Sequence, residues 1–200
     1  MHEVDEGEIL YDNREFTGLK NKLRKEIRKE IGMVFQGGAL FDSETVEQNV
    51  MFPLEMFTEM TLEERRDRAN FCLKRVNLIN VNSLFPSEIS GGMQKRVSIA
   101  RAIALNPKYL FCDEPNSGLD PVTSAVIDNL IKEIALEYNM TTIINTHDMN
   151  SVVEIADKIL FIHQGQKWWE GNRDDIFHTE NEEINNFVFS SKKMQKLKNS

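Results

Sequence analysis

Residues 109–115, YLFCDEP, decide the fold class and direct the search for a functional site. The first four are apolar and do not alternate with polar residues, which is typical of a buried strand in a parallel sheet. Asp113 and Glu114 follow directly, and open α/β sheets bind ligands at the carboxyl ends of their strands. One carboxylate at such a place can hold Mg²⁺, and the next can activate a water molecule. The same two residues could equally cap a helix or lie in a loop.

The flanking sequence alternates short apolar runs with amphipathic segments. Strands are expected at residues 7–11, 31–35, 109–112 and 141–145. Helices are expected over residues 19–30, after the capping residue Thr61, from Ser90 to about residue 105, and after the capping residue Asp120. Residues 157–168 are typical of a hairpin that turns at Gln164 and Gly165. Strands that alternate with helices in this way indicate a parallel α/β sheet.

Residues from about 41 to 100 are nearly all helical in pattern and interrupt this alternation. The interruption indicates a helical subdomain inserted between two halves of the sheet domain. We therefore expect four parts, which are a partial core over residues 1–40, a helical subdomain over 41–100, the remainder of the core over 101–189, and a frayed tail over 190–200.

Three further places could bind phosphate or magnesium. Residues 90–94, SGGMQ, open a helix, where two glycines let backbone N–H groups approach an anion, although a plain turn and cap would use the same residues. His147 follows the strand expected at 141–145 and could donate to a phosphate, or it could be an ordinary surface histidine. Gln36 follows the strand at 31–35 and could touch Mg²⁺ or water, or it could be a loop residue without a role.

The order of these motifs is more informative than any one of them. The chain contains in turn FQ at 35–36, SGGMQ at 90–94, LFCDEP at 110–115, SGLDP at 117–121 and THD at 146–148. This order resembles the ABC ATPase family, in which the Q-loop, signature motif, Walker B motif, D-loop and H-loop follow one another. The resemblance extends from about residue 7 to about residue 175. It implies an α/β fold with a P-loop NTPase-like (RecA-like) parallel sheet core, N-terminally incomplete, and an inserted α-helical signature subdomain.

The resemblance also implies an ATPase activity with ATP and Mg²⁺ as cofactors. Asp113 would position Mg²⁺ and Glu114 would be the general base, while Gln36 would contact the metal and sense the γ-phosphate. His147 would contact the γ-phosphate. The residues that would contact ATP held by a second ATPase subunit across a dimer are Ser90, Gly91, Gly92, Met93, Gln94 and Asp120.

Two residues depart from the usual signature motif, since Ile89 stands for Leu and Met93 for Gln. The methionine variant, together with QGGALFDS at 36–43 and FPL at 52–54, is similar to the ATPases of the Mla (MCE-associated) lipid-transport group. That similarity implies a phospholipid substrate. It also implies an ABC permease and an MCE-type substrate-binding protein as partners.

None of the ten glycines is followed by lysine, so the phosphate-binding pattern G-x-x-x-x-G-K-[ST] does not occur in these residues. One explanation is that the 200 residues belong to a longer chain. The other is a degenerate subunit that lends its signature motif to the ATP site of an intact partner. Both explanations predict that the isolated chain neither binds ATP tightly nor hydrolyses it.

Composition narrows the functional classes to which the protein could belong. The net charge of −8 disfavours a nucleic-acid binder, because phosphate contacts need clustered Lys and Arg. The two cysteines show no metal-ligand spacing and are expected to be buried free thiols. Without a signal peptide or an apolar span, the chain is expected in the cytoplasm, held at the membrane by its permease. The alternatives are an ABC ATPase of translation or chromosome maintenance and a non-catalytic interaction subunit.

Overall fold

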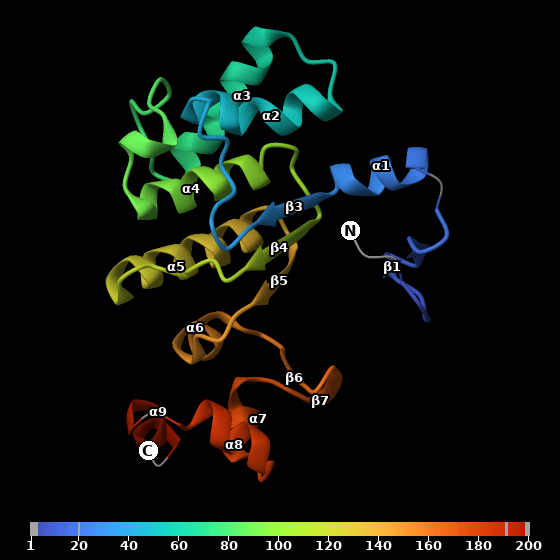
Figure 1. Ribbon diagram of the computed structural model, residues 1–200, viewed down its shortest axis with the longest axis vertical. Helices are drawn as coiled ribbons and strands as arrows, with labels where there is room; N and C mark the ends of the chain where they lie inside the picture. Colours follow the sequence, from blue (N-terminus) through green and yellow to red (C-terminus); the bar gives the residue numbers. More distant parts are fainter. Residues whose placement is uncertain (1–3, 20, 191, 199–200) are drawn as a thin grey trace. The chain divides into compact units, whose positions relative to one another are not determined.

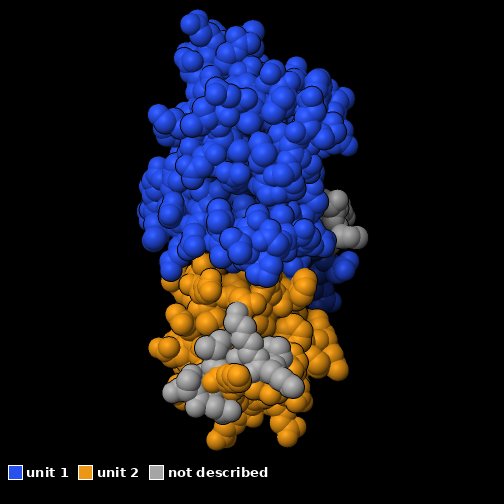
Figure 2. Space-filling model, turned by 90° about the vertical axis from the view of Figure 1, so that its left-hand side faces the viewer, with its two compact units in different colours: residues 1–145 blue, residues 146–200 orange. Residues whose placement is uncertain are grey.

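The computed structural model describes residues 4–19, 21–190 and 192–198. Contacts divide the chain into two compact units, residues 1–145 and residues 146–200, which Figure 2 colours separately. The division after residue 145 does not coincide with the boundaries expected after residues 40, 100 and 189. Those boundaries remain predictions of a finer subdivision.

A three-stranded parallel sheet forms the centre of the first unit. Its order is β3 (Ile31–Val34), β4 (Tyr109–Asp113) and β5 (Thr141–Asn145), which confirms the parallel α/β core predicted from the sequence (Figure 1). The register pairs Asp113 with Asn145. The carboxyl ends of the strands therefore meet at one edge of the sheet, where the motif residues begin.

The strand expected over residues 7–11 is wrong in extent. Only β1 (Leu10–Tyr11) forms there, and it pairs antiparallel with β2 (Arg14–Glu15) in a separate two-stranded sheet. The helix expected over residues 19–30 is α1 (Asn21–Lys29), and it leads directly into β3.

One face of the parallel sheet is buried and the other is open. Val34, Leu110 and Cys112 are buried in a core shared with the helices α4 (Gly91–Ala102) and α5 (Pro121–Glu137). The opposite face carries the row Met33, Phe111 and Ile143, in which Met33 is 42% and Ile143 is 52% exposed. The strand expected over residues 141–145 forms, but its Ile143 side chain is exposed on this face.

A helical layer lies between β3 and β4 in the sequence and covers the buried face. It consists of α2 (Val46–Phe57), α3 (Leu62–Arg75), the short 3-10 helix η1 (Pro86–Glu88) and α4. Thr61 and Glu64 cap each other's backbone at the start of α3, as predicted from their spacing. Buried Asn49 on α2 donates to the carbonyls of Phe41 and Glu44, which fixes the loop that follows β3.

The second unit has its own small core. It contains α6 (Met149–Ile155), the hairpin β6 (Ile159–His163) and β7 (Gln166–Gly171), and the short helices α7 (Arg173–His178), α8 (Glu182–Val188) and α9 (Lys192–Lys198). The hairpin turns at Gln164 and Gly165, both with positive φ, as predicted. The expectation of a frayed tail is wrong for residues 192–198, because Met194 packs into this core. Across the described ranges, the structure has no helix that is both long and apolar enough to span a bilayer.

Both cysteines are free and buried, as predicted, with Cys72 on α3 and Cys112 on β4. Burial raises the pKa of Cys72 to about 11 and that of Cys112 to about 12, and only the thiolate is nucleophilic. We expect neither thiol of the folded chain to react with iodoacetamide at pH 8 within the time in which both react in urea. Mass spectrometry of the alkylated protein measures this, and rapid labelling of Cys112 without denaturant would contradict the buried strand.

Candidate functional site

Asp113 and Glu114 stand at the carboxyl end of the central strand, β4, as predicted. The side-chain amide of Asn145, at the end of β5, donates to Asp113 Oδ1 over 2.8 Å. The Glu114 backbone N–H donates to the Asn145 carbonyl over 2.9 Å, so the chain continues the sheet pairing for one more residue. Glu114 then adopts a left-handed φ of 45°, which ends the strand and turns the chain. The Asp113 side chain is exposed and that of Glu114 is half-buried.

Gln36 lies just after β3 at the same edge of the sheet. Its side-chain Nε2 donates to Ser117 Oγ over 3.2 Å, and Ser117 N–H donates to the Glu114 carbonyl over 3.1 Å. Residues far apart in the sequence, Gln36 and the segment 113–117, are thus brought together by the parallel pairing of β3 with β4. The sequence predicted each residue separately, and the structure joins them through Ser117.

The chemistry of this edge fits Mg²⁺. Magnesium is usually held by one or two carboxylates together with waters and substrate phosphates, not by a cage of protein ligands. Exposed Asp113 offers such a carboxylate, and exposed Gln36 offers an amide oxygen. The described part of the chain contains no group of three or more His, Cys, Asp or Glu residues that could enclose a metal.

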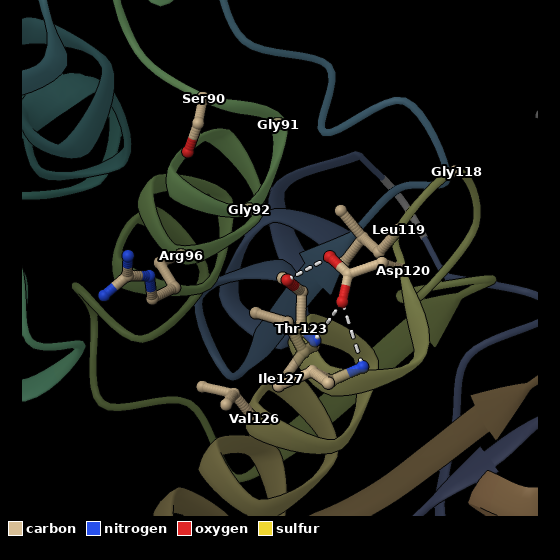
Figure 3. A pocket seen from close by; sticks show the side chains of 11 residues that line it. Ser90, Gly91, Gly92, Arg96, Gly118, Leu119, Asp120, Thr123, Val126 and Ile127 are labelled. Atoms are coloured by element: carbon tan, nitrogen blue, oxygen red, sulfur yellow. Dashed lines mark hydrogen bonds between the residues drawn. The ribbon is translucent and has the colours of Figure 1, made fainter.

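The signature residues open α4 beside the start of α5. Ser90 is the N-cap of α4, and its Oγ accepts a hydrogen bond from Met93 N–H over 3.3 Å. A pocket of about 480 Å³ lies between the two helix starts and is lined by Ser90, Gly91, Gly92 and Asp120 (Figure 3). Two helix N-termini direct their partial positive charges to this region, which suits an anionic ligand.

Two of the predicted signature contacts do not line this pocket. Met93 packs against the core of the first unit. The Gln94 side chain donates to the Pro86 carbonyl over 2.9 Å and so holds η1 against α4. Their predicted contact with nucleotide stays a prediction.

Asp120 caps α5 and is itself held in place. Its Oδ1 accepts from the N–H groups of Val122 and Thr123 over 3.0 Å, and its Oδ2 accepts from the Thr123 hydroxyl. These bonds, above all the one from the Thr123 hydroxyl, hold the pKa of Asp120 below its usual range. The hydrogen bonds between Asp120 and Thr123 thus fix the orientation of the Asp120 side chain beside the pocket.

Among the residues that line the pocket and that sequence reasoning did not predict, two have polar side chains, Thr123 and Arg96. A side-chain Cβ at Gly92 would lie 2.8 Å from Thr123 Cγ2, so glycine is what lets α4 approach α5 here. Arg96 also lines the pocket, and its guanidinium donates to the Asn77 carbonyl over 3.1 Å. The Asp-x-x-Thr spacing at 120–123 is a capping signal that could have indicated Thr123.

His147 belongs to the second unit, two residues beyond the end of β5, and its side chain is exposed. Its predicted contact with phosphate stays a prediction. Asp148, the next residue, caps α6 through the Asn150 N–H.

Comparison with known proteins agrees with this geometry. The model of the ABC transporter family matches residues 1–117. A methionine import ATP-binding protein of Bacillus cereus is 40% identical over 171 residues, which cover 86% of this chain and 50% of that protein. The intermembrane phospholipid transport ATP-binding protein of Haemophilus influenzae is 36% identical over 184 residues, covering 92% and 70% respectively. The chain thus spans about half the length of the methionine relatives.

Solved structures give the same picture. The dimeric ATP-binding cassette MJ0796, bound to ADP and Pi in a post-hydrolysis state, matches with a TM-score of 0.76 and 35% identity, over 84% of this chain and 74% of that one. The cassette cbiO1 from Clostridium perfringens, part of an ABC transporter complex, matches with a TM-score of 0.79 and 31% identity, over 98% and 77%.

Proposed function

Because this chain belongs to the ATP-binding subunits of ABC transporters, we propose that it supplies the hydrolytic carboxylates and the signature pocket of an ATP-driven transporter. The observation that carries the proposal is the assembly of Gln36, Asp113, Glu114 and Ser117 at the carboxyl edge of the sheet. The phosphate-binding pattern G-x-x-x-x-G-K-[ST] does not occur within these 200 residues.

Each residue of this edge has a role that its surroundings support. Glu114 accepts a proton from the water that attacks the γ-phosphate, which is the task of a positioned carboxylate beside a bound phosphate. Asp113 would hold Mg²⁺, which would neutralise charge on the phosphate oxygens, and Asn145 orients Asp113 for that contact. Gln36 would contact the metal and the attacking water, and it precedes the loop that follows β3.

The signature pocket serves ATP held by a second cassette. Ser90, Gly91 and Gly92 present backbone N–H groups at the start of α4, and Asp120 lies beside them on the neighbouring helix. The likeness to a dimeric cassette bound to ADP and Pi supports a dimer in which each pocket closes on the nucleotide of its partner. The loop from residue 41 and α2 then face an ABC permease that brings the subunit to the inner face of the membrane.

Nucleotide binding by two forms of the protein tests this function. We expect the isolated chain to show no ATP binding below about 1 mM, since no Gly-Lys loop cradles the phosphates. The same chain, extended by any coding sequence that lies in frame upstream in its gene, should bind and hydrolyse ATP if that extension supplies a phosphate-binding loop. Isothermal titration and phosphate release measure the two activities. Micromolar ATP binding by the isolated chain that Asp113→Asn abolishes would contradict the proposal.

For the substrate we propose a phospholipid, delivered by an MCE-type binding protein. The supporting observations are Met93 in the signature motif and the phospholipid-transport relative, of which this chain covers 70%. Methionine is the second candidate, because a methionine import relative is 40% identical to this chain. ATP turnover by the subunit with its permease in lipid nanodiscs distinguishes them. Stimulation by an MCE-type protein supports the phospholipid, and stimulation by methionine with its binding protein supports the amino acid.

A further inference from the structure

Lys95 is a buried lysine one turn into the signature helix, α4. Its side chain is only 6% exposed. Lysine is almost never fully buried unless its ammonium has partners, because removing the charge from water is costly. A lysine at this depth is therefore expected to have partners for its ammonium.

The partners of Lys95 are two backbone carbonyls from different motifs. Its Nζ donates to the carbonyl of Gln36, just after β3, and to that of Glu114, just after β4, over 3.5 Å in the second case. Burial lowers the pKa of Lys95, and the negative charge of Glu114 acts in the opposite direction. The Lys95 ammonium thus interacts electrostatically with Glu114, whose carboxylate lies at the carboxyl edge of the sheet.

The two carbonyls belong to segments that need support. Glu114 has a left-handed φ of 45°, which side chains adopt only at some cost in free energy. Its carbonyl already accepts from Ser117 N–H over 3.1 Å, and Ser117 Oγ accepts from the Gln36 side chain over 3.2 Å. Lys95 completes this ring of contacts, because its Nζ donates to the carbonyls of both Gln36 and Glu114.

Other residues of α4 hold the loop after β3 but do not reach Glu114. Arg101 donates to the carbonyls of Gly38 and Ala39 over 2.8 and 2.7 Å, and Ser98 Oγ donates to the Gly38 carbonyl over 3.3 Å. Lys95 differs from both because its ammonium touches the two turns at once.

We propose that Lys95 is a positioning residue that ties the turn carrying Gln36 to the turn carrying Glu114 and fixes both on the signature helix. A movement of α4, such as the closing of the signature pocket on a nucleotide, then shifts the hydrolytic glutamate and the Gln36 loop together. The consequence for turnover rests on the proposed function, whereas the mechanical link itself does not.

Backbone hydrogen exchange of the full chain without nucleotide tests the link. The reporters are the N–H groups of Gly38, Glu114 and Ser117, which are bonded to Phe35, Asn145 and Glu114 carbonyls. Lys95→Met keeps most of the apolar stem of the side chain and removes the donor. We expect all three reporters to exchange about tenfold or more faster, since a hydrogen bond from a charged donor is lost at each turn. The amides of α3 should keep their rates.

Ser98→Ala is the matched control, because it removes a contact from the same helix to Gly38 only. It should accelerate Gly38 and leave Glu114 and Ser117 unchanged. Wild-type exchange rates at Glu114 and Ser117 in folded Lys95→Met would overturn the proposal. The proposal would also fail if Ser98→Ala accelerated exchange at Glu114 and Ser117 as much as Lys95→Met does. If Lys95→Met does not fold, Lys95→Gln, which retains a neutral donor, should show the same pattern at smaller amplitude, and wild-type rates there overturn the proposal equally.

A kinetic readout separates this inference from the proposed function. In the form that carries a phosphate-binding loop, Lys95→Met should lower kcat about tenfold or more and change KM for ATP less than about twofold, because Lys95 positions groups and does not touch nucleotide. A change in KM with kcat intact would contradict the positioning role. Absence of turnover in the wild type would count against the proposed function alone, and the exchange pattern would still decide the link.

Discussion

Replacement of Glu114 by glutamine will lower ATP turnover by about 10²–10⁴-fold in the form that contains a phosphate-binding loop, because the amide cannot accept the proton of the attacking water. The backbone of Glu114 is already fixed by its N–H bond to Asn145 and its carbonyl bonds to Ser117 and Lys95. Glutamine keeps these backbone bonds and the size of the side chain. Steady-state phosphate release measures the loss, and ATP binding should persist.

Glu59→Gln is the control for the charge change, since Glu59 is exposed in the loop between α2 and α3. It should leave turnover within about twofold of the wild type. Equal activity of Glu114→Gln and the wild type would assign proton transfer to another group. A simultaneous loss of nucleotide binding would indicate that Glu114 acts on the ground state and not on the reaction.

Substitution of Gly92 by alanine will lower the free energy of unfolding by about 1–3 kcal/mol and reduce ATP turnover. The new Cβ would lie 2.8 Å from Thr123 Cγ2, below any ordinary contact distance. Thr123 cannot easily give way, because its χ1 is stiff and its hydroxyl is bonded to Asp120. The helices α4 and α5 must therefore separate at the pocket. Urea unfolding and phosphate release measure the two effects.

Neighbouring positions provide a sharp comparison. A Cβ at Gly91 would meet Leu119 Cδ2 at 3.9 Å, an ordinary contact, so Gly91→Ala should stay within about 1 kcal/mol of the wild type. Adding Thr123→Ser to Gly92→Ala removes the clashing methyl group and keeps the hydroxyl on Asp120, so it should restore most of the lost stability. Equal stability of the two alanine variants, or no rescue by serine, would refute the close approach at Gly92.

The elements predicted best from the sequence are those with strong local signals. Thr61 and Asp120 cap helices where the sequence placed them, and the hairpin turn falls at Gln164 and Gly165. The apolar run before Asp113 predicted the central strand, and the register of β4 with β5 explains why Asn145 meets Asp113. Local chemistry determines the two caps, the turn and the central strand, so one segment suffices to predict each of them, whereas the contact of Asn145 with Asp113 depends on the pairing of two strands.

Features that depend on distant segments were missed. Ile143 reads as a core residue, yet it is exposed, because burial depends on what covers a face and not on the strand itself. The tail over 192–198 reads as polar, yet Met194 anchors it. Lys95 reads as a solvated charge in a helix, and only the fold shows two carbonyls from residues 36 and 114 around its ammonium. Thr123 has a local capping signal, but its place in the pocket wall depends on the close approach of α4 and α5.

The pairing of β3 with β4 also has a consequence for synthesis on the ribosome. Residues 35–108 must be translated after β3 before its neighbour exists, which takes roughly 4–15 s at about 5–20 residues per second. During that interval the cover available to β3 is the set of helices that follows it, since Val34 packs in the same core as α2, α3 and α4. Nascent chains halted near residue 108 are therefore expected to carry a folded helical layer on β3, while the edge of β3 that pairs with β4 is still unpaired.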